Sequence, residues 1–333
     1  MALPPHVVED CMGLLKLLSD GTVIRSKIHF QEQPSSPIQH HTNNLVLFRD
    51  FLYNKKFNLH LRFYKPKSNN NHHNNNINDK FPVLMFLHGG GFCFGSSAWP
   101  HIHAACMRLA ATLPAAVAAP DYRLAPEHRL PAAVDDGVEA VRWLRRQARE
   151  EGEAWVREGV DFGRVFVVGD SSGGNIAHHL AVQLGPGSRE MGPVRVRGYV
   201  LLGPFFGGVV RTRSEVGPPE QMMNLEMLDR LWRLSIPIGE SRDHPLANPF
   251  GPGSPNLQDV KLDPILVIVG GNELLKDRAA EYAARLKEIG KNVEYVEFEG
   301  KEHGFLTHDS HSEVAKDAMQ IIQRFMLQYS NQS

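Results

Sequence analysis

The sequence has little of several features that would assign it to a specialised class. It contains only three cysteines, Cys11, Cys93 and Cys106, an odd number without paired or metal-binding spacing. This pattern excludes a disulfide framework and predicts reduced thiols, as in a cytosolic protein. The formal net charge of −1 excludes the strongly basic surface that nucleic-acid binding needs, so we expect no nucleic-acid partner.

Long apolar runs are also missing. No stretch is long enough to span a bilayer, and residues 1–5 lack the basic and apolar regions of a secretion signal. We therefore expect no membrane partner and a location in the cytoplasm, with access to the nucleus. The hydrophobic fraction of 42% is still enough for a large core, and we expect residues 1–333 to form one domain.

Two glycine-rich motifs are present, HGGG at 88–91 and GDSSG at 169–173. The second has the G-x-S-x-G pattern of a nucleophile elbow, in which Ser171 stands at a sharp strand-to-helix turn and glycines let the backbone come close. Buried strands are predicted directly before both motifs, at 81–87 and 165–168. A lone G-x-S-x-G is no more than a turn in many proteins, but this strand-flanked pair predicts a serine hydrolase.

Such chemistry needs a histidine base for the serine and a carboxylate to hold the tautomer of the histidine. In this kind of hydrolase the chain order is serine, acid, histidine. His303 lies in EHGF at 302–305, after the strand-like segment 292–298, and therefore on a loop where a strand ends. His303 is the predicted base.

Three acids flank the buried strand predicted at 264–271. Asp263 precedes the strand and lies at its wrong end. Glu273 follows the glycines that end the strand. Asp277 lies one helical turn further, where an exposed acid at a helix start is favoured by the helix dipole. We prefer Glu273 as the acid and keep Asp277 as the alternative.

In combination, the motifs resemble those of the plant carboxylesterases in the hormone-sensitive-lipase-like branch of the α/β-hydrolases. The resemblance extends over nearly the whole chain. It rests on LLKLLSDGTVIRS at 14–26, HGGGF at 88–92, DYRLAPEH at 121–128, GDSSGGN at 169–175 and EHGF at 302–305.

This resemblance implies a catalytic Ser171 and a general base at His303. It implies an oxyanion hole formed by the backbone N–H groups of Gly89, Gly90 and Ser172. It also implies an acid at position 273, where most members of the family carry aspartate. This chain departs from that pattern with Glu273, which is one methylene longer, although glutamate serves as the acid in other hydrolases of this fold.

The plant gibberellin receptor shares the scaffold, but it has lost the catalytic histidine and only binds its hormone. His303 is present here, which favours an enzyme. We therefore expect a serine carboxylesterase that hydrolyses a small to medium apolar ester or lactone, such as a strigolactone or a xenobiotic, through an acyl-enzyme, without a cofactor or a metal. A non-catalytic or slow hormone-binding receptor is the alternative, and the oligomeric state stays open.

Alternating strands and helices predict the α/β-hydrolase fold, a mostly parallel central sheet flanked by helices, with a helical cap. An opening hairpin is expected at 44–65, and the Asn- and His-rich composition after it predicts a disordered loop at 68–79. Segments 1–40 and 205–250 are rich in apolar residues and do not fit the alternation. The resemblance implies that they form a cap over Ser171, where methionines and aromatics suit a bulky apolar ligand.

Overall fold

A computed structural model describes residues 4–26, 45–67, 80–149, 152–187, 189–221 and 223–330. The loop predicted to be disordered, 68–79, lies outside the described residues. The same is true of 27–40, the second part of the first predicted cap segment.

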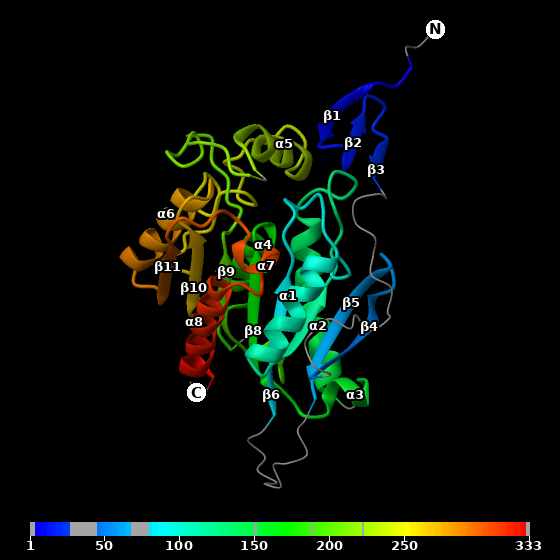
Figure 1. The fold of residues 1–333 in the computed structure, drawn as a ribbon, viewed down its shortest axis with the longest axis vertical. Helices are drawn as coiled ribbons and strands as arrows, with labels where there is room; N and C mark the ends of the chain where they lie inside the picture. The colour runs from blue at the N-terminus through cyan, green and yellow to red at the C-terminus, as the bar shows by residue number, and fades with distance from the viewer. Residues whose placement is uncertain are drawn as a thin grey trace.

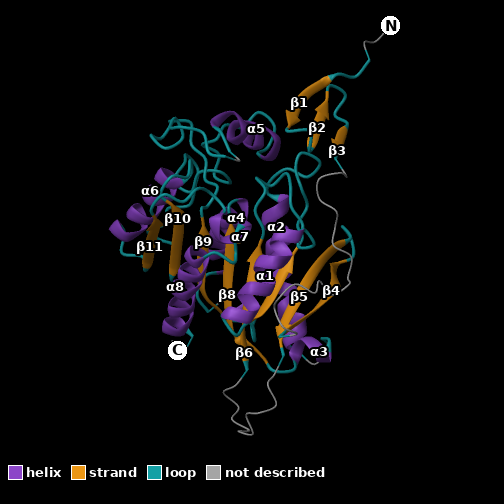
Figure 2. Ribbon diagram, viewed as in Figure 1, coloured by secondary structure: helices purple, strands orange, loops and turns teal. Residues whose placement is uncertain are grey.

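Eight strands in the described part of the chain form the central sheet, in the order β11-β10-β9-β8-β6-β7-β5-β4 (Figure 2). Neighbouring strands are parallel, except that β5 is antiparallel to both β4 and β7. The mostly parallel sheet and the opening hairpin, β4–β5, are thus confirmed. The strands are β4 (Val46–Asn54), β5 (Leu59–Pro66), β6 (Phe81–Leu87), β7 (Ala116–Pro120), β8 (Val160–Asp170), β9 (Val196–Leu202), β10 (Ile265–Gly270) and β11 (Val293–Phe298).

Strand β6 illustrates why helices must cover both faces of the sheet. Val83, Met85 and Leu87 belong to the core on one face, Leu84 and Phe86 to the core on the other, and all five are fully buried. Helices α2, α4 and α6 pack on the first face, and α1 and α8 on the second (Figure 1). No helix in the described ranges is long and apolar enough to cross a membrane. The helices are α1 (Pro100–Thr112), α2 (Ala132–Ala148), α3 (Ala154–Arg157), α4 (Ser172–Leu184), α5 (Leu225–Ser235), α6 (Lys276–Glu288), α7 (Phe305–His308) and α8 (Glu313–Tyr329).

A cap lies beyond one end of the sheet and has two parts, helix α5 and a small antiparallel sheet of β1, β2 and β3 (Figure 1). The expected helical cap is therefore helical only in its second part. Gly13 and Gly21 have φ values of 70° and 87°, and they form tight turns that fold the N-terminal segment into strands. The strands are β1 (Val7–Cys11), β2 (Leu15–Leu18) and β3 (Val23–Arg25).

Ion pairs and ring stacking hold the two parts of the cap to each other and to the sheet. The carboxylate of Glu9 on β1 lies 3.1 Å from Arg230 and 2.7 Å from Arg233, both on α5. On its inner side, α5 stacks Trp232 on Phe205, with ring centroids 4.2 Å apart and planes inclined by 17°. Phe205 follows β9, so α5 is tied to the end of a core strand.

Candidate active site

Ser171 forms the turn between β8 and α4, with φ 55° and ψ −115°. Few residues adopt such a backbone, and the neighbouring glycines explain how this one does. A Cβ on Gly169 would collide with the carbonyl oxygen of Gly173, and a Cβ on Gly173 would collide with that of Leu87. The backbone N–H of Ser171 donates to the carbonyl of Leu202 at 2.8 Å, which fixes the turn against β9. The G-x-S-x-G motif therefore forms the predicted elbow.

The glycine loop after β6 packs directly against Ser171. A Cβ on Gly89 would lie 3.1 Å from the Cβ of Ser171. Gly90 has φ 117°, a conformation that side chains disfavour, and a Cβ there would collide with the backbone carbonyl of Phe94. A Cβ on Gly91 would lie within 2.5 Å of Leu231 on α5. Glycine thus permits the close approach of this loop to the elbow and the cap, most strictly at Gly90.

His88 and Tyr122 support this loop from below. Their rings are stacked with centroids 4.2 Å apart, and the Tyr122 hydroxyl donates to the backbone carbonyl of His88 at 2.9 Å. The same hydroxyl lies 3.3 Å from the Oγ of the buried Ser172. His88 Nδ1 lies 2.8 Å from the carbonyl oxygen of Gly89, which can only accept, so Nδ1 carries the proton. Burial lowers the pKa of His88 and keeps the ring neutral.

Glu273 and His303 meet between the loops that follow β10 and β11. Nδ1 of His303 lies 3.3 Å from Oε2 of Glu273, whose side chain is almost completely buried. Burial by itself would lower the pKa of His303. The hydrogen bond and the charge of Glu273, with the charges of Asp170 and Glu220, overcome this and raise that pKa to about 9. The preferred acid is thus the carboxyl group that contacts the predicted base.

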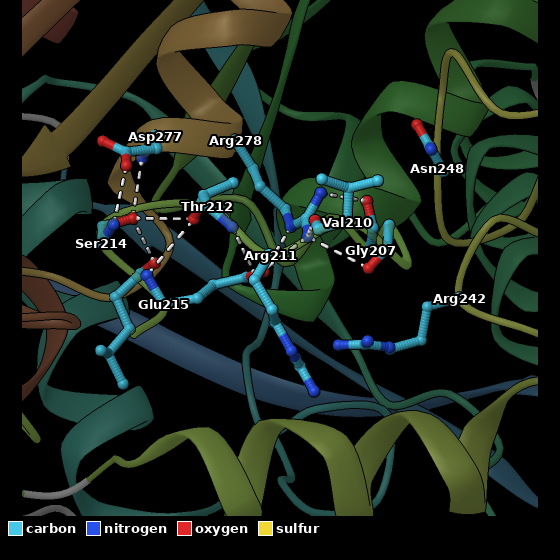
Figure 3. Close-up of polar contacts among 12 residues, drawn as sticks. Gly207, Val210, Arg211, Thr212, Ser214, Glu215, Arg242, Asn248, Asp277 and Arg278 are labelled. Atoms are coloured by element: carbon cyan, nitrogen blue, oxygen red, sulfur yellow. Dashed lines mark hydrogen bonds and ion pairs between the residues drawn. The ribbon is translucent and has the colours of Figure 1, made fainter. Parts of the chain in front are cut away.

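Asp277, the alternative acid, is engaged elsewhere. Its Oδ2 accepts a hydrogen bond from the backbone N–H of Ser214 at 2.7 Å (Figure 3). The Ser214 hydroxyl donates to the carbonyl of Leu274 at 2.8 Å. The sequence predicts that Asp277 is an exposed acid at a helix start. Its position at the start of α6 is as predicted, but its exposure is not. Asp277 is half-buried, because the cap segment that contains Ser214 packs over the first turn of α6. Asp263 lies just before β10, at the opposite end of the strand from Glu273.

A cavity of about 460 Å³ lies between the elbow, the glycine loop, the loop of His303 and the cap. Ser171, His303 and the three loop glycines line its floor. No lysine or arginine is found among the described residues around it, whereas three acids are: Asp170, Glu220 and Glu302. The roof is apolar and comes from both parts of the cap: Met12, Leu14, Met223, Met227, Leu228 and Leu231.

The motifs did not indicate any of these three acids as site residues. Glu302 lies inside EHGF, directly before His303. Asp170 lies inside GDSSG, and its Oδ2 accepts a hydrogen bond from Thr307 Oγ1 at 3.0 Å. Glu220 lies in the cap segment after β9, in a stretch without a recognisable pattern. Its proximity to His303 depends on how the cap folds, so the local sequence carries no signal for it.

The paired histidines that could suggest a metal site have other partners. His178 Nδ1 lies 3.0 Å from the Tyr282 hydroxyl, and His103 Nδ1 lies 2.9 Å from that of Tyr64. Both histidines are buried. No group of three or more potential metal ligands was found in the described part of the chain.

The sheet order, the elbow and the cavity above it define an α/β hydrolase. A sequence model of the alpha/beta hydrolase fold family matches residues 84–307, and the chain belongs to this family. Carboxylesterase 20 of Arabidopsis thaliana is 35% identical to the chain, over 88% of the chain and 89% of the relative. The resemblance to plant carboxylesterases is confirmed.

Receptors and enzymes both occur among the proteins to which the chain is similar. A gibberellin receptor of Arabidopsis thaliana is 33% identical, over 90% of the chain and 86% of the receptor. Among solved structures, a hyperthermophilic esterase from the archaeon Pyrobaculum calidifontis is similar with a TM-score of 0.69 at 29% identity, covering 84% of this chain and 85% of that chain. The carboxylesterase and esterase relatives support a carboxylic ester hydrolase, and the roles of individual residues have to be argued from the site.

Proposed function

We propose that the protein is a serine carboxylesterase in which Ser171 is the nucleophile, His303 the general base and Glu273 the acid that orients the base. At the coarser level the chain is a carboxylic ester hydrolase, in agreement with its carboxylesterase and esterase relatives. The main support for these residue roles is the contact of His303 with Glu273, next to a cavity that both Ser171 and His303 line.

In the proposed first step, His303 takes the proton of the Ser171 hydroxyl while Oγ forms a bond to the ester carbonyl carbon. Glu273 accepts a hydrogen bond from the Nδ1–H group, which holds the ring in the tautomer with a free Nε2, and its charge stabilises the imidazolium. When the carbon–oxygen bond of the ester breaks, the alcohol leaves with the proton from His303. Water, deprotonated by His303, then attacks the acyl-enzyme and releases the carboxylic acid and Ser171. A lactone would follow the same steps and yield a hydroxy acid.

The negative charge on the carbonyl oxygen needs fixed donors. We assign this role to the backbone N–H groups of Gly89, Gly90 and Ser172. Ser172 is the first residue of α4, where backbone N–H groups point out of the helix and the helix dipole favours an anion. The proximity of Gly89 to Ser171 supports the assignment.

The size and lining of the cavity support a small to medium apolar ester or lactone. Strigolactones and xenobiotic esters fall within this class. We take segments 1–40 and 205–250 to be the cap that selects among such substrates. The three cysteines are buried and unpaired, which supports a reducing, cytoplasmic location with access to the nucleus.

A hormone-binding receptor is the second candidate, because a gibberellin receptor is among the relatives. A receptor needs no general base, and the contact between His303 and Glu273 favours turnover. The decisive experiment is a screen of short p-nitrophenyl esters with and without an organophosphate inhibitor. We expect hydrolysis that the inhibitor abolishes and that falls about a millionfold in a folded Ser171→Ala variant. Undiminished hydrolysis by this variant would exclude the mechanism, and tight binding without turnover would favour the receptor.

A further inference from the structure

The carboxylate of Glu220 bridges the two loops that contain the acid and the base. Its Oε1 accepts a hydrogen bond from the backbone N–H of Leu274, the residue after Glu273, at 2.7 Å. Its Oε2 accepts one from the backbone N–H of His303, also at 2.7 Å. A single side chain of the cap therefore spans the gap across which Glu273 and His303 meet.

A second contact strengthens the link between the cap and the histidine loop. The backbone N–H of Gln221 donates to Oε2 of Glu302 at 3.2 Å. Residues 220–221 and 302–303 thus exchange hydrogen bonds in both directions. The backbone N–H of Glu220 donates to the carbonyl of Met223 at 2.9 Å, which connects the bridging residue to the segment just before α5.

The segment that leads to Glu220 is firmly attached to the start of α6. The guanidinium of Arg278 donates to the carbonyl oxygens of Gly207, at 3.0 Å, and Val210, at 2.8 Å, and forms a buried ion pair with Glu215 (Figure 3). Asp277 accepts a hydrogen bond from the backbone N–H of Ser214 and so attaches the same segment to α6. Since α6 begins just after Leu274, the cap segment and the acid loop are anchored to the same point of the fold.

The titratable groups around His303 come from four elements. Glu273 lies after β10, Asp170 at the end of β8, Glu220 in the cap, and His308 on α7. Glu220 differs from the other two acids because it approaches the backbone of His303, on a segment that belongs to the cap. Burial raises the pKa of Glu220, while its two backbone hydrogen bonds oppose this shift.

We propose that Glu220 is a positioning residue for the proposed hydrolysis, contributed by the cap, which holds the loops of Glu273 and His303 at the separation that their contact requires. The inference rests on the proposed function. If Glu220 has this role, the acid and the base are aligned only while the cap segment stays bound to their loops. The cap would then contribute both to substrate binding and to the alignment of the catalytic residues.

The test compares Glu220→Gln with Glu240→Gln, which removes the same charge from an exposed position of the cap. The amide in Glu220→Gln places an N–H donor against a backbone donor and removes the negative charge near His303. We expect kcat for a short acetate ester to fall about tenfold or more, with KM changed less than about threefold. The ionisation of His303 in the pH profile of kcat/KM should move towards neutral pH. Glu240→Gln should match the wild type.

Two further measurements keep this test independent of folding and of the proposed function. Glu220→Asp retains the charge but can reach at most one of the two loops, so it should restore the pH profile and only part of kcat. NMR titration of the His303 ring, assigned with a His303→Gln variant, reports the same ionisation without turnover. If the wild type hydrolyses no ester but the ring titrates lower in Glu220→Gln, the proposed function fails and the role of Glu220 stands. An unchanged titration and pH profile in Glu220→Gln would overturn the inference, whatever happens to kcat.

Discussion

Glu273 and His303 stand thirty residues apart in the sequence, yet Oε2 of the acid lies 3.3 Å from Nδ1 of the histidine. Their loops follow neighbouring parallel strands, β10 and β11, so the two side chains emerge at the same edge of the sheet. Glu273 thus still contacts the ring, although it is one methylene longer than the aspartate that the resemblance implies at this position.

The first prediction concerns the identity of the acid. Glu273→Gln keeps the shape of the side chain but removes the charge that stabilises the imidazolium, so kcat should fall about 10⁴-fold. Glu273→Asp keeps the charge but has a shorter reach, and it should retain partial activity. Steady-state kinetics on a p-nitrophenyl ester measures both.

Asp277→Asn is the matched control for that experiment. It weakens the bond to Ser214, so we expect a loss of about 1–2 kcal/mol in the free energy of unfolding but little change in kcat. If the Asp277→Asn variant were inactive and the Glu273→Gln variant active, Asp277 would be the catalytic acid.

The second prediction concerns pH. A base must be neutral to accept a proton, and the acids around His303 raise its pKa to about 9. Below that value the ring is mostly protonated, so kcat/KM should rise with pH, by roughly tenfold per unit, and level off near pH 9. In Glu273→Gln the plateau should begin at a lower pH. A profile that is flat from pH 6 to pH 9 would contradict the electrostatic description of the site.

The third prediction tests the oxyanion hole. A side chain at Gly90 would collide with the backbone of Phe94 and displace the donor that the negatively charged oxygen needs. Gly90→Val should therefore lower kcat about 10²–10³-fold, the effect of losing one donor in comparable enzymes. An increase in KM alone would mean that the glycines only form a turn.

The fourth prediction concerns the roof of the cavity. Met12 and Leu14 line the cavity from the N-terminal part of the cap, whereas Val8 lies outside the lining and is about half exposed. Met12→Ala and Leu14→Ala should raise KM for a bulky apolar ester about threefold to tenfold and leave a small acetate ester unaffected. Val8→Ala should change neither. Equal losses on both esters would argue against a role in selectivity.

The fifth prediction follows from the charge of the lining, which contains acids and, among the described residues, no lysine or arginine. An ester whose acyl chain ends in a carboxylate should be hydrolysed at least about tenfold less efficiently than a neutral ester of equal length. Glu302→Gln, which removes one negative charge from the lining, should narrow this difference. Competition between the two esters in one assay gives the ratio of kcat/KM directly, and equal efficiencies would contradict the prediction.

The parts of this molecule that depend on local pattern were predictable from the sequence. The elbow around Ser171 and the glycine loop are short segments in which close backbone approach leaves glycine as the only suitable residue. The strand β6 is a continuous apolar run because it is buried on both faces. The contact of His303 with Glu273 rather than with Asp277 also agrees with the distance of each acid from the end of the strand.

Features that depend on distant contacts could not be predicted in this way. The N-terminal segment was expected to be part of a helical cap, but the turns at Gly13 and Gly21 and the pairing of its strands decide its structure. Asp277 was expected to be exposed, because nothing near it in the sequence reveals that residues 211–215 pack over it. Glu220 is separated from His303 by 83 residues, and only the path of the cap brings them together.

One glycine that lies in none of the sequence motifs limits which homologues can be catalytically active. Gly203 follows β9 with φ 46°, and a Cβ there would lie 2.7 Å from Nδ1 of His303 and 3.0 Å from Oε1 of Glu273. Any side chain at this position would separate the two groups while leaving the signature sequences untouched. A homologue could therefore retain both glycine motifs, the serine, the acid and the histidine and still be inert, so position 203 should be inspected before such a homologue is named an enzyme.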